Sequence, residues 1–309
     1  MNPQALQATP VAVLLGGNSA EREVSLHSGQ TVIKALQGLG FEVRPVDPAA
    51  PDWLAQLAGV SFAFIALHGP GGEDGSMQGA LQMLGIPYTG SRVLGSALAM
   101  DKLRSKQLWQ GMGVSTGGFF SLAADSDWQG VIDRFGKVFV KPATEGSSIG
   151  MTAASSAAEL QLAYQTASGF GEAVIAEQFI DGPEYTVAIL GDEALPAIRL
   201  ETDNEFYDYE AKYLSDDTRY HCPCGLAPAA ERELAELALQ AFRSVGCAVW
   251  GRVDIMRDAA GRFYVLEVNT IPGFTDHSLL PKAAAEVGVG FDELVGRLLG
   301  MARQRDTAR

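Results

Sequence analysis

The sequence has few cysteines, a minority of basic residues and no long hydrophobic run. Its three cysteines, Cys222, Cys224 and Cys247, are too few for a disulfide framework, and their spacing fits neither a zinc knuckle nor a redox pair. No apolar run approaches the roughly 20 residues that span a bilayer, and the first ten residues lack the basic and apolar regions of a signal peptide. We therefore expect reduced cysteines in a cytoplasmic protein that does not bind membranes.

Basic residues number 23 against 37 acidic ones, which gives a net charge of −14. A chain this acidic is a poor partner for nucleic acid or for an anionic membrane surface. A polyanion such as ATP would need a few local cations, together with metal ions, to bind. The remaining composition, 47% hydrophobic and 19% charged residues over 309 positions, is typical of a globular protein of two or three domains.

Hydrophobic periodicity predicts two kinds of domain. Apolar runs at 11–15, 41–46 and 62–67 alternate with a helical pattern at 23–39, which is typical of a parallel α/β domain over roughly the first 95 residues. The pattern changes after Gly113 to that of an α+β region. The further strands that we expect are 138–140, 174–177, 185–190, 195–200, 248–256 and 262–268, and the further helices are 102–110, 128–135, 157–167, 229–245, 281–287 and 291–301.

The last two expected strands place four polar side chains on one face. Residues two apart in a strand share a face, so Arg252 lies beside Asp254 on the first strand. On the second strand, Glu267 lies beside Asn269 in the same way. The oxygen-bearing side chains suit a hard cation such as Mg²⁺, and Arg252 suits an oxyanion or a transferring phosphoryl group. A solvated face with cross-strand charge pairs is the alternative interpretation.

Three loops that follow expected strands have the composition of ligand-binding turns. Lys141 ends a strand before residues 143–150, whose small residues allow backbone N–H groups to approach a phosphate, although the P-loop order is absent. Glu21 follows the first strand and two glycines, and it either caps the next helix or meets an ammonium group. His68 begins the loop 68–75 at a strand end, where open sheets bind ligands. Each loop could instead be an ordinary surface turn.

These segments together resemble D-alanine–D-alanine ligases, members of the ATP-grasp superfamily. The resemblance extends from about residue 11 to residue 303 and rests on strings that occur in order here: LLGGNSAEREVSL, LHGPGGEDGSMQG, MDKLRSK, VKPATEGSSIGM, FYDYEAKYL, GRVDIM and LEVNTIPGFTDHSLLP. It implies three domains, at 1–97, 98–182 and 183–309, with ATP held between the second and third. The first is the parallel α/β domain. An irregular polar stretch at about 203–224, which is long for a loop, would be a mobile lid.

The resemblance also implies a reaction. ATP phosphorylates the carboxylate of one D-alanine, and the amine of a second D-alanine displaces the phosphate to give a dipeptide for peptidoglycan precursors. The positions that match the family's ATP-binding residues are Lys102, Lys141, Glu177, Gln178, Ile180, Glu184 and Lys212. The positions that match its ligands of two Mg²⁺ or Mn²⁺ ions are Asp254, Glu267 and Asn269. Gln178 departs from some relatives, which have Lys there.

Substrate positions follow from the same resemblance. The residues that match those acting on the first D-alanine and the acyl centre are Glu21, His68, Ser147, Tyr213, Arg252 and Gly273. The carboxylate of the second D-alanine would meet Ser278 and the N–H of Leu279. The resemblance further implies a homodimer.

Three other functions remain open at this point. A ligase that uses D-lactate would differ in the lid, where Glu210-Ala211-Lys212-Tyr213 resembles the dipeptide-forming type. A nucleotide-binding regulatory protein would not need Arg252 at an acyl centre. A nicotinamide-dependent oxidoreductase is disfavoured because the glycines after the first strand lack the G-x-G-x-x-G spacing.

Overall fold

The computed structural model describes residues 9–171, 173–202 and 218–307. Lys212 and Tyr213, which the resemblance assigns to the site, lie outside the described residues, as does most of the expected lid. Within these segments the strands form three sheets. No helix in the same part of the chain is both long and apolar enough to cross a membrane. The three cysteines are free thiols, as expected.

The N-terminal sheet is parallel, with the order β2-β1-β3. It consists of β1 (Val11–Leu14), β2 (Val43–Val46) and β3 (Phe62–Ile65), and α1 (Arg22–Gly38) packs against it. Both β1 and β3 are buried along their whole length, which explains their continuous apolar sequences. The predicted parallel α/β domain is confirmed. Periodicity did not reveal three short helices, α2 (Trp53–Gln56), α3 (Ser76–Met83) and α4 (Val93–Met100).

The central sheet is antiparallel, with the order β4-β7-β5-β6. Its strands are β4 (Phe119–Leu122), β5 (Val138–Pro142), β6 (Thr152–Ala154) and β7 (Val174–Gln178). The helix α5 (Lys102–Met112) precedes the sheet, and α6 (Trp128–Phe135) and α7 (Ala157–Ala167) share a hydrophobic core with it. The expected helices at 102–110, 128–135 and 157–167 are therefore confirmed.

The third sheet has six strands in the order β11-β10-β8-β12-β13, with β9 paired to β8. Its strands are β8 (Glu184–Leu190), β9 (Glu193–Ala194), β10 (Ile198–Glu201), β11 (Arg219–His221), β12 (Trp250–Arg257) and β13 (Phe263–Asn269), and α9 (Pro228–Ser244) packs on one face. The strand expected at 195–200 begins only at Ile198, because Pro196 has no N–H for a ladder and lies in the gap between β9 and β10. The strand β11 lies inside the stretch expected to be irregular.

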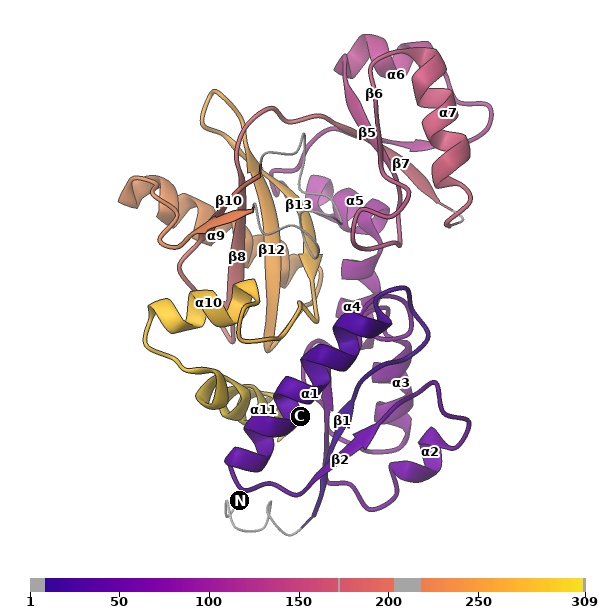
Figure 1. The fold of residues 1–309 in the computed structure, drawn as a ribbon. Coiled ribbons are helices and arrows are strands. Elements are labelled where there is room, and N and C mark those ends of the chain that lie inside the picture. Colours follow the sequence, from indigo (N-terminus) through magenta and orange to yellow (C-terminus); the bar gives the residue numbers. More distant parts are fainter. Residues whose placement is uncertain (1–8, 172, 203–217, 308–309) are drawn as a thin grey trace.

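The last two helices return to the N-terminal domain. α10 (Leu279–Glu286) follows the third sheet, and α11 (Phe291–Thr307) lies beside α1 (Figure 1). Leu294 and Leu298 of α11 are fully buried in the same hydrophobic core as Val11 of β1. The N-terminal sheet therefore owes part of its core to residues almost 300 positions later in the sequence.

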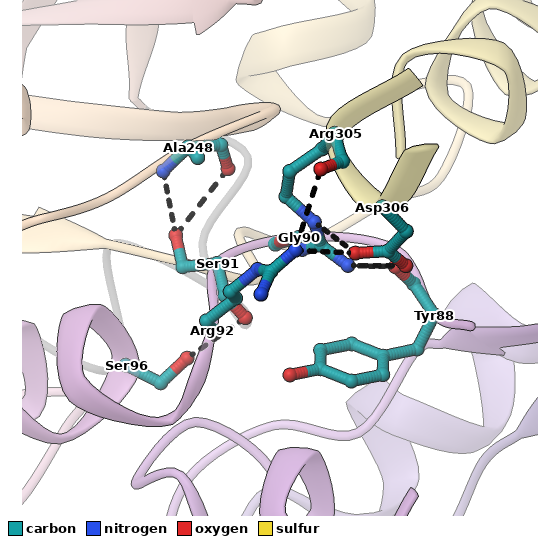
Figure 2. Close-up of polar contacts among 8 residues, drawn as sticks. All are labelled: Tyr88, Gly90, Ser91, Arg92, Ser96, Ala248, Arg305 and Asp306. Atoms are coloured by element: carbon teal, nitrogen blue, oxygen red, sulfur yellow. Dashed lines mark hydrogen bonds and ion pairs between the residues drawn. The ribbon is translucent and has the colours of Figure 1, made fainter. Parts of the chain in front are cut away.

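Polar contacts at the end of α11 reinforce this association (Figure 2). The guanidinium of Arg305 donates to the carbonyl of Tyr88 at 3.0 Å and to that of Gly90, and Asp306 accepts from Arg92 at 2.8 Å. Nearby, the hydroxyl of Ser91 exchanges hydrogen bonds with the backbone that leads into β12. The segment after β3 is thus attached both to α11 and to the third sheet.

Candidate active site

Two clefts open beside the third sheet. The inter-sheet cleft, of about 370 Å³, lies between the central and third sheets. The loop cleft, of about 510 Å³, lies among the loops that follow β1, β3 and β13. Four residues line both clefts and mark their junction: Lys102, Gly146, Ser147 and Glu267.

Every candidate site residue that the structure describes lines at least one of these clefts. The candidates for ATP, which line the inter-sheet cleft, are Lys102, Lys141, Glu177, Gln178, Ile180 and Glu184. The candidates for the amino-acid substrates, which line the loop cleft, are Glu21, His68, Ser147, Arg252, Gly273, Ser278 and Leu279. Of the candidate metal ligands, Asp254 lines the inter-sheet cleft, Asn269 lines the loop cleft and Glu267 lines both.

The hairpin of β12 and β13 has the polar face that strand alternation predicts. In its register Arg252 is opposite Asn269, and Asp254 is opposite Glu267. The guanidinium of Arg252 donates two hydrogen bonds to the carboxylate of Asp254, at 2.9 and 2.8 Å. The same carboxylate accepts from Nδ2 of Asn269 at 2.9 Å and from the hydroxyl of Thr186 at 2.6 Å. This face lines the two clefts and not an open outer surface.

The chemistry of the donor set decides whether a metal ion fits here. Asp254, Glu267 and Asn269 offer the oxygen ligands that Mg²⁺ and Mn²⁺ prefer. Among the described residues, no three Asp, Glu, His or Cys side chains are grouped to hold a metal ion by themselves. Mg²⁺ commonly binds one or two carboxylates together with substrate phosphates. The site therefore fits a cation that takes its remaining ligands from a nucleotide.

Two lysines, Lys102 and Lys141, line the inter-sheet cleft opposite this hairpin. Nζ of Lys102 lies 3.0 Å from the carboxylate of Glu267 and 2.7 Å from the carbonyl of Glu145. Lys141 pairs with Glu177, and so does Lys106, which sequence patterns did not single out. Burial favours the neutral acid, but the two lysines together hold the pKa of Glu177 below its ordinary value. The carboxylate expected at the adenine site is thus held between two ammonium groups.

Glu21 connects the N-terminal domain with the loop after β5. It lies at the N-terminus of α1, where its side chain makes no capping hydrogen bond, so the capping interpretation is not supported. Instead its carboxylate accepts from the hydroxyl of Ser147 at 2.5 Å. Ser147 and Ser148 have φ values of 52° and 61°, a left-handed conformation that is unfavourable for residues other than glycine. The loop is therefore held in a strained conformation over the loop cleft.

His68 is buried and holds the turn after β13. Burial lowers its pKa, so the imidazole is neutral at physiological pH. Nδ1 lies 2.9 Å from the carbonyl of Ile271, which can only accept, so Nδ1 is the protonated nitrogen. Nε2 then accepts from the hydroxyl of Ser28 at 3.1 Å, and Ser28 accepts from the N–H of Phe274 at 3.3 Å. These bonds orient the turn that contains Gly273.

Glu73 makes a second connection to this turn, which the sequence patterns missed. Its carboxylate accepts from the N–H of Gly69 at 2.8 Å and from the N–H of Ile271 at 3.3 Å. Burial raises its pKa to about 8, and repulsion by Glu21 adds to the effect. Glu73 lies in the string LHGPGGEDGSMQG, but its partner Ile271 is too distant in the sequence for a local pattern to reveal the contact.

The N-terminus of α10 faces the loop cleft. Ser278 is its N-cap residue, and its hydroxyl accepts from the N–H of Thr275 at 2.9 Å. Leu279 begins the helix, and N–H groups in a first turn have no partner within their own helix. Together with the positive end of the helix dipole, such groups attract a carboxylate.

The fold and the site define an ATP-grasp protein. A central and a third sheet enclose a cleft lined by lysines, and the carboxylates of a β-hairpin lie at the edge of this cleft. A parallel N-terminal domain completes the second, loop-lined cleft.

Comparisons with known proteins identify the family. Residues 50–91 match the family model for the D-ala D-ala ligase N-terminus, and residues 108–300 match that for the D-ala D-ala ligase C-terminus. A D-alanine–D-alanine ligase of Alkalilimnicola ehrlichii is 54% identical over 307 residues, covering 99% of this chain and 98% of that one. The chain therefore belongs to the D-alanine–D-alanine ligases, which are ATP-dependent enzymes. The resemblance seen in the sequence is confirmed.

Solved structures agree with this assignment. The crystal structure of a D-alanine–D-alanine ligase from Bacillus anthracis has a TM-score of 0.88 and 33% identity, covering 97% of this chain and 100% of that one. A structure of the Bacillus anthracis ligase complexed with ATP has a TM-score of 0.86 and 31% identity, with the same coverage. The three-domain ATP-grasp fold predicted from the resemblance is confirmed at the level of the fold class.

Proposed function

We propose that this enzyme joins two D-alanine molecules through a D-alanyl phosphate, with ATP as the phosphoryl donor. The observation that supports this most directly is the junction of the two clefts at Lys102, Gly146, Ser147 and Glu267. An amino-acid carboxylate in the loop cleft can meet the terminal phosphate of a nucleotide at that junction. Phosphorylation there turns a poor leaving group into a good one, so that an amine can displace it.

ATP occupies the inter-sheet cleft in this proposal. Lys102 and Lys141 contact its phosphates as point charges. Gln178, Ile180 and Glu184 line the same cleft and hold adenine and ribose. We also assign Glu177 and Lys212 to ATP binding. The carboxylate of Glu177 pairs with Lys106 and Lys141. Lys212 lies outside the described residues.

Asp254, Glu267 and Asn269 would hold two Mg²⁺ or Mn²⁺ ions. When bound, such ions neutralise the phosphates and align the transferred group. The protein's own contribution is to hold the two carboxylates in place. Arg252 and Thr186 donate hydrogen bonds to Asp254, and Lys102 pairs with Glu267.

The first D-alanine binds through its ammonium group to Glu21, with Ser147 holding the loop over it. Arg252 and the N–H of Gly273 stabilise the negative oxygen that forms when the second amine attacks the acyl carbon. His68 acts on this step by holding the turn that contains Gly273. Tyr213, outside the described residues, would complete the contacts to the first substrate.

The second D-alanine binds by its carboxylate to the hydroxyl of Ser278 and the N–H of Leu279 at the start of α10. This arrangement leaves its amine directed toward the acyl phosphate. Because the reacting groups approach each other as bound molecules, amide formation becomes an intramolecular step within the complex.

Residues 98–182 and 183–309 close on ATP, and a lid at 203–224 excludes water that would hydrolyse the acyl phosphate. The enzyme acts as a cytoplasmic homodimer in peptidoglycan precursor synthesis. It has no nucleic-acid or membrane partner, which the net charge of −14 supports.

An assay of ADP release with Mg²⁺ and ATP tests this function. Release should depend on D-alanine, with one D-alanyl-D-alanine formed per ADP by mass spectrometry, and D-lactate and L-alanine should be poor second substrates. Absence of D-alanine-dependent release from protein that binds ATP would contradict the proposal. Preferential formation of D-alanyl-D-lactate would instead assign the chain to the depsipeptide-forming ligases.

A further inference from the structure

Lys106 is a buried cation for which the reaction described above has no role. It lies on α5, one helical turn after Lys102, and its side chain is 0% exposed. Lys106 lines neither cleft. Burial of a lysine is costly unless the ammonium group is paired and hydrogen-bonded. The position of this side chain therefore needs an explanation.

Burial lowers the pKa of Lys106, but its contacts are those of a protonated ammonium group. Its Nζ contacts the carboxylate of Glu177, the hydroxyl of Thr116 at 2.7 Å and the carbonyl of Val265 at 3.5 Å. The hydroxyl of Thr116 donates its own hydrogen to Val265 at 2.7 Å, so toward Lys106 it accepts. All three partners are acceptors, and they match the three N–H donors of a protonated lysine.

Glu177 links Lys106 to the inter-sheet cleft. One oxygen of this carboxylate contacts Lys106, and the other contacts Lys141, which lines the cleft. Two ammonium groups share one carboxylate, so the group of three has one net positive charge. Without Lys106, the negative charge of Glu177 would neutralise Lys141 completely. A phosphate in the cleft would then meet a neutral ion pair.

We propose that Lys106 is a positioning residue for nucleotide binding, which balances the charge of Glu177 so that Lys141 keeps a positive potential toward phosphate. This inference rests on the proposed use of ATP in the inter-sheet cleft. Lys106 does not touch the nucleotide; it acts through Glu177. At the effective dielectric constant of a partly buried site, one unit charge several ångströms away changes the binding constant of an anion by about ten-fold or more.

A double-mutant cycle with Glu177 separates charge balance from packing. Lys106→Met should raise the dissociation constant of Mg-ADP, measured by isothermal titration calorimetry, by about ten-fold or more. In the Glu177→Gln background the buried Lys106 has lost its paired carboxylate and, because burial lowers its pKa, it loses its proton. The same substitution then removes no charge and should change that constant by less than about two-fold. Equal weakening in both backgrounds, or no weakening in either, would overturn the inference.

Two further variants keep this experiment decisive. Lys106→Gln can still donate to Thr116 and Val265, so it replaces the Met variant if that protein does not fold. Lys34→Met removes the same charge from the exposed face of α1 and should leave the Mg-ADP constant unchanged. An equal effect of Lys34→Met would mean that net charge alone is responsible, and this too would overturn the inference.

The steady-state parameters distinguish this inference from the proposed function. In Lys106→Met the KM for ATP should rise while the KM for D-alanine stays within about two-fold of the wild type. Wild-type protein that binds Mg-ADP without D-alanine-dependent turnover would contradict the ligase function, but it would not contradict the role of Lys106 in nucleotide binding. Normal turnover without coupling between Lys106 and Glu177 would support the ligase function and contradict the role of Lys106.

Discussion

Glu73 gives the loop cleft a carboxyl group that stays protonated to high pH. Burial, and then repulsion by Glu21, raises its pKa from 4.5 to about 8. Between these values the folded protein binds a proton that the unfolded chain has released, so this group lowers the free energy of unfolding as pH rises. Glu73→Gln should remove this contribution and make the loss of stability between about pH 5 and about pH 8 shallower.

Thermal denaturation of the substrate-free protein over this pH range measures the effect. Glu193, an exposed carboxylate at the start of β9, provides the matched control, and Glu193→Gln should keep the wild-type slope. If Glu73→Gln and the wild type lose stability in parallel, Glu73 is not protonated in the folded protein.

Glu267 is the candidate metal ligand that lines both clefts. Glu267→Gln removes a negative charge from the donor set and the partner of Lys102, so the Mg²⁺ concentration for half-maximal rate should rise by at least about ten-fold. Initial rates over a Mg²⁺ titration measure this change, and circular dichroism verifies the fold. Glu193→Gln is the control, because Glu193 is an exposed carboxylate that lines neither cleft. An unchanged Mg²⁺ requirement in Glu267→Gln would remove Glu267 from the ligand set.

Sequence patterns find residues whose partners are near in the chain. The polar face that contains Asp254 and Glu267 follows from strand alternation and a short turn, and the structure confirms it. Lys106 and Glu73 have no such signal, because their partners Glu177 and Ile271 belong to other elements. Their importance depends on tertiary packing.

At the scale of secondary structure, prediction succeeded where one periodicity was continuous. The apolar strand β1 and the amphipathic helix α9 were both expected. It failed for α4, whose sequence VLGSALAM is apolar on almost every side, and for α3, which starts after Gly75 with a φ of 92°. These helices are defined by their surroundings rather than by a polar face of their own.

Gly95 of α4 illustrates that dependence on surroundings. A Cβ at this position would lie 2.4 Å from the carbonyl of Gly246, in the turn after α9. Gly95→Ala should therefore lower the free energy of unfolding by about 1–3 kcal/mol, the usual cost of overpacking, despite the better helix propensity of alanine. Urea denaturation followed by circular dichroism measures the change.

Gly79 of α3 is the matched control for this substitution. A Cβ there would make ordinary contact, 3.9 Å from the side chain of Val93, so alanine should be neutral or stabilising. Equal stability of the Gly95→Ala and Gly79→Ala proteins would show that α4 can move away from the turn at Gly246.

At the scale of the whole molecule, Arg305 attaches α11 to the segment after β3. Arg305→Ala removes charge-assisted bonds to the carbonyls of Tyr88 and Gly90 and should lower the free energy of unfolding by about 1–3 kcal/mol. Arg297→Ala on the same helix is the control, since Arg297 pairs with Glu293 on an exposed face and should contribute much less. Equal losses in the two variants would mean that the contacts of Figure 2 add no stability beyond a surface ion pair.

The shared core of β1 and α11 has a consequence for biosynthesis. A domain usually folds as its own residues leave the ribosome, beginning with the N-terminal domain. Here the N-terminal sheet lacks the buried side chains of Leu294 and Leu298 until α11 has also been synthesised. During translation the apolar surface of β1 and α1 therefore stays partly uncovered while the central and third sheets are being made. A chaperone that binds exposed hydrophobic segments of nascent chains should be found on this surface, and it should leave once α11 has emerged.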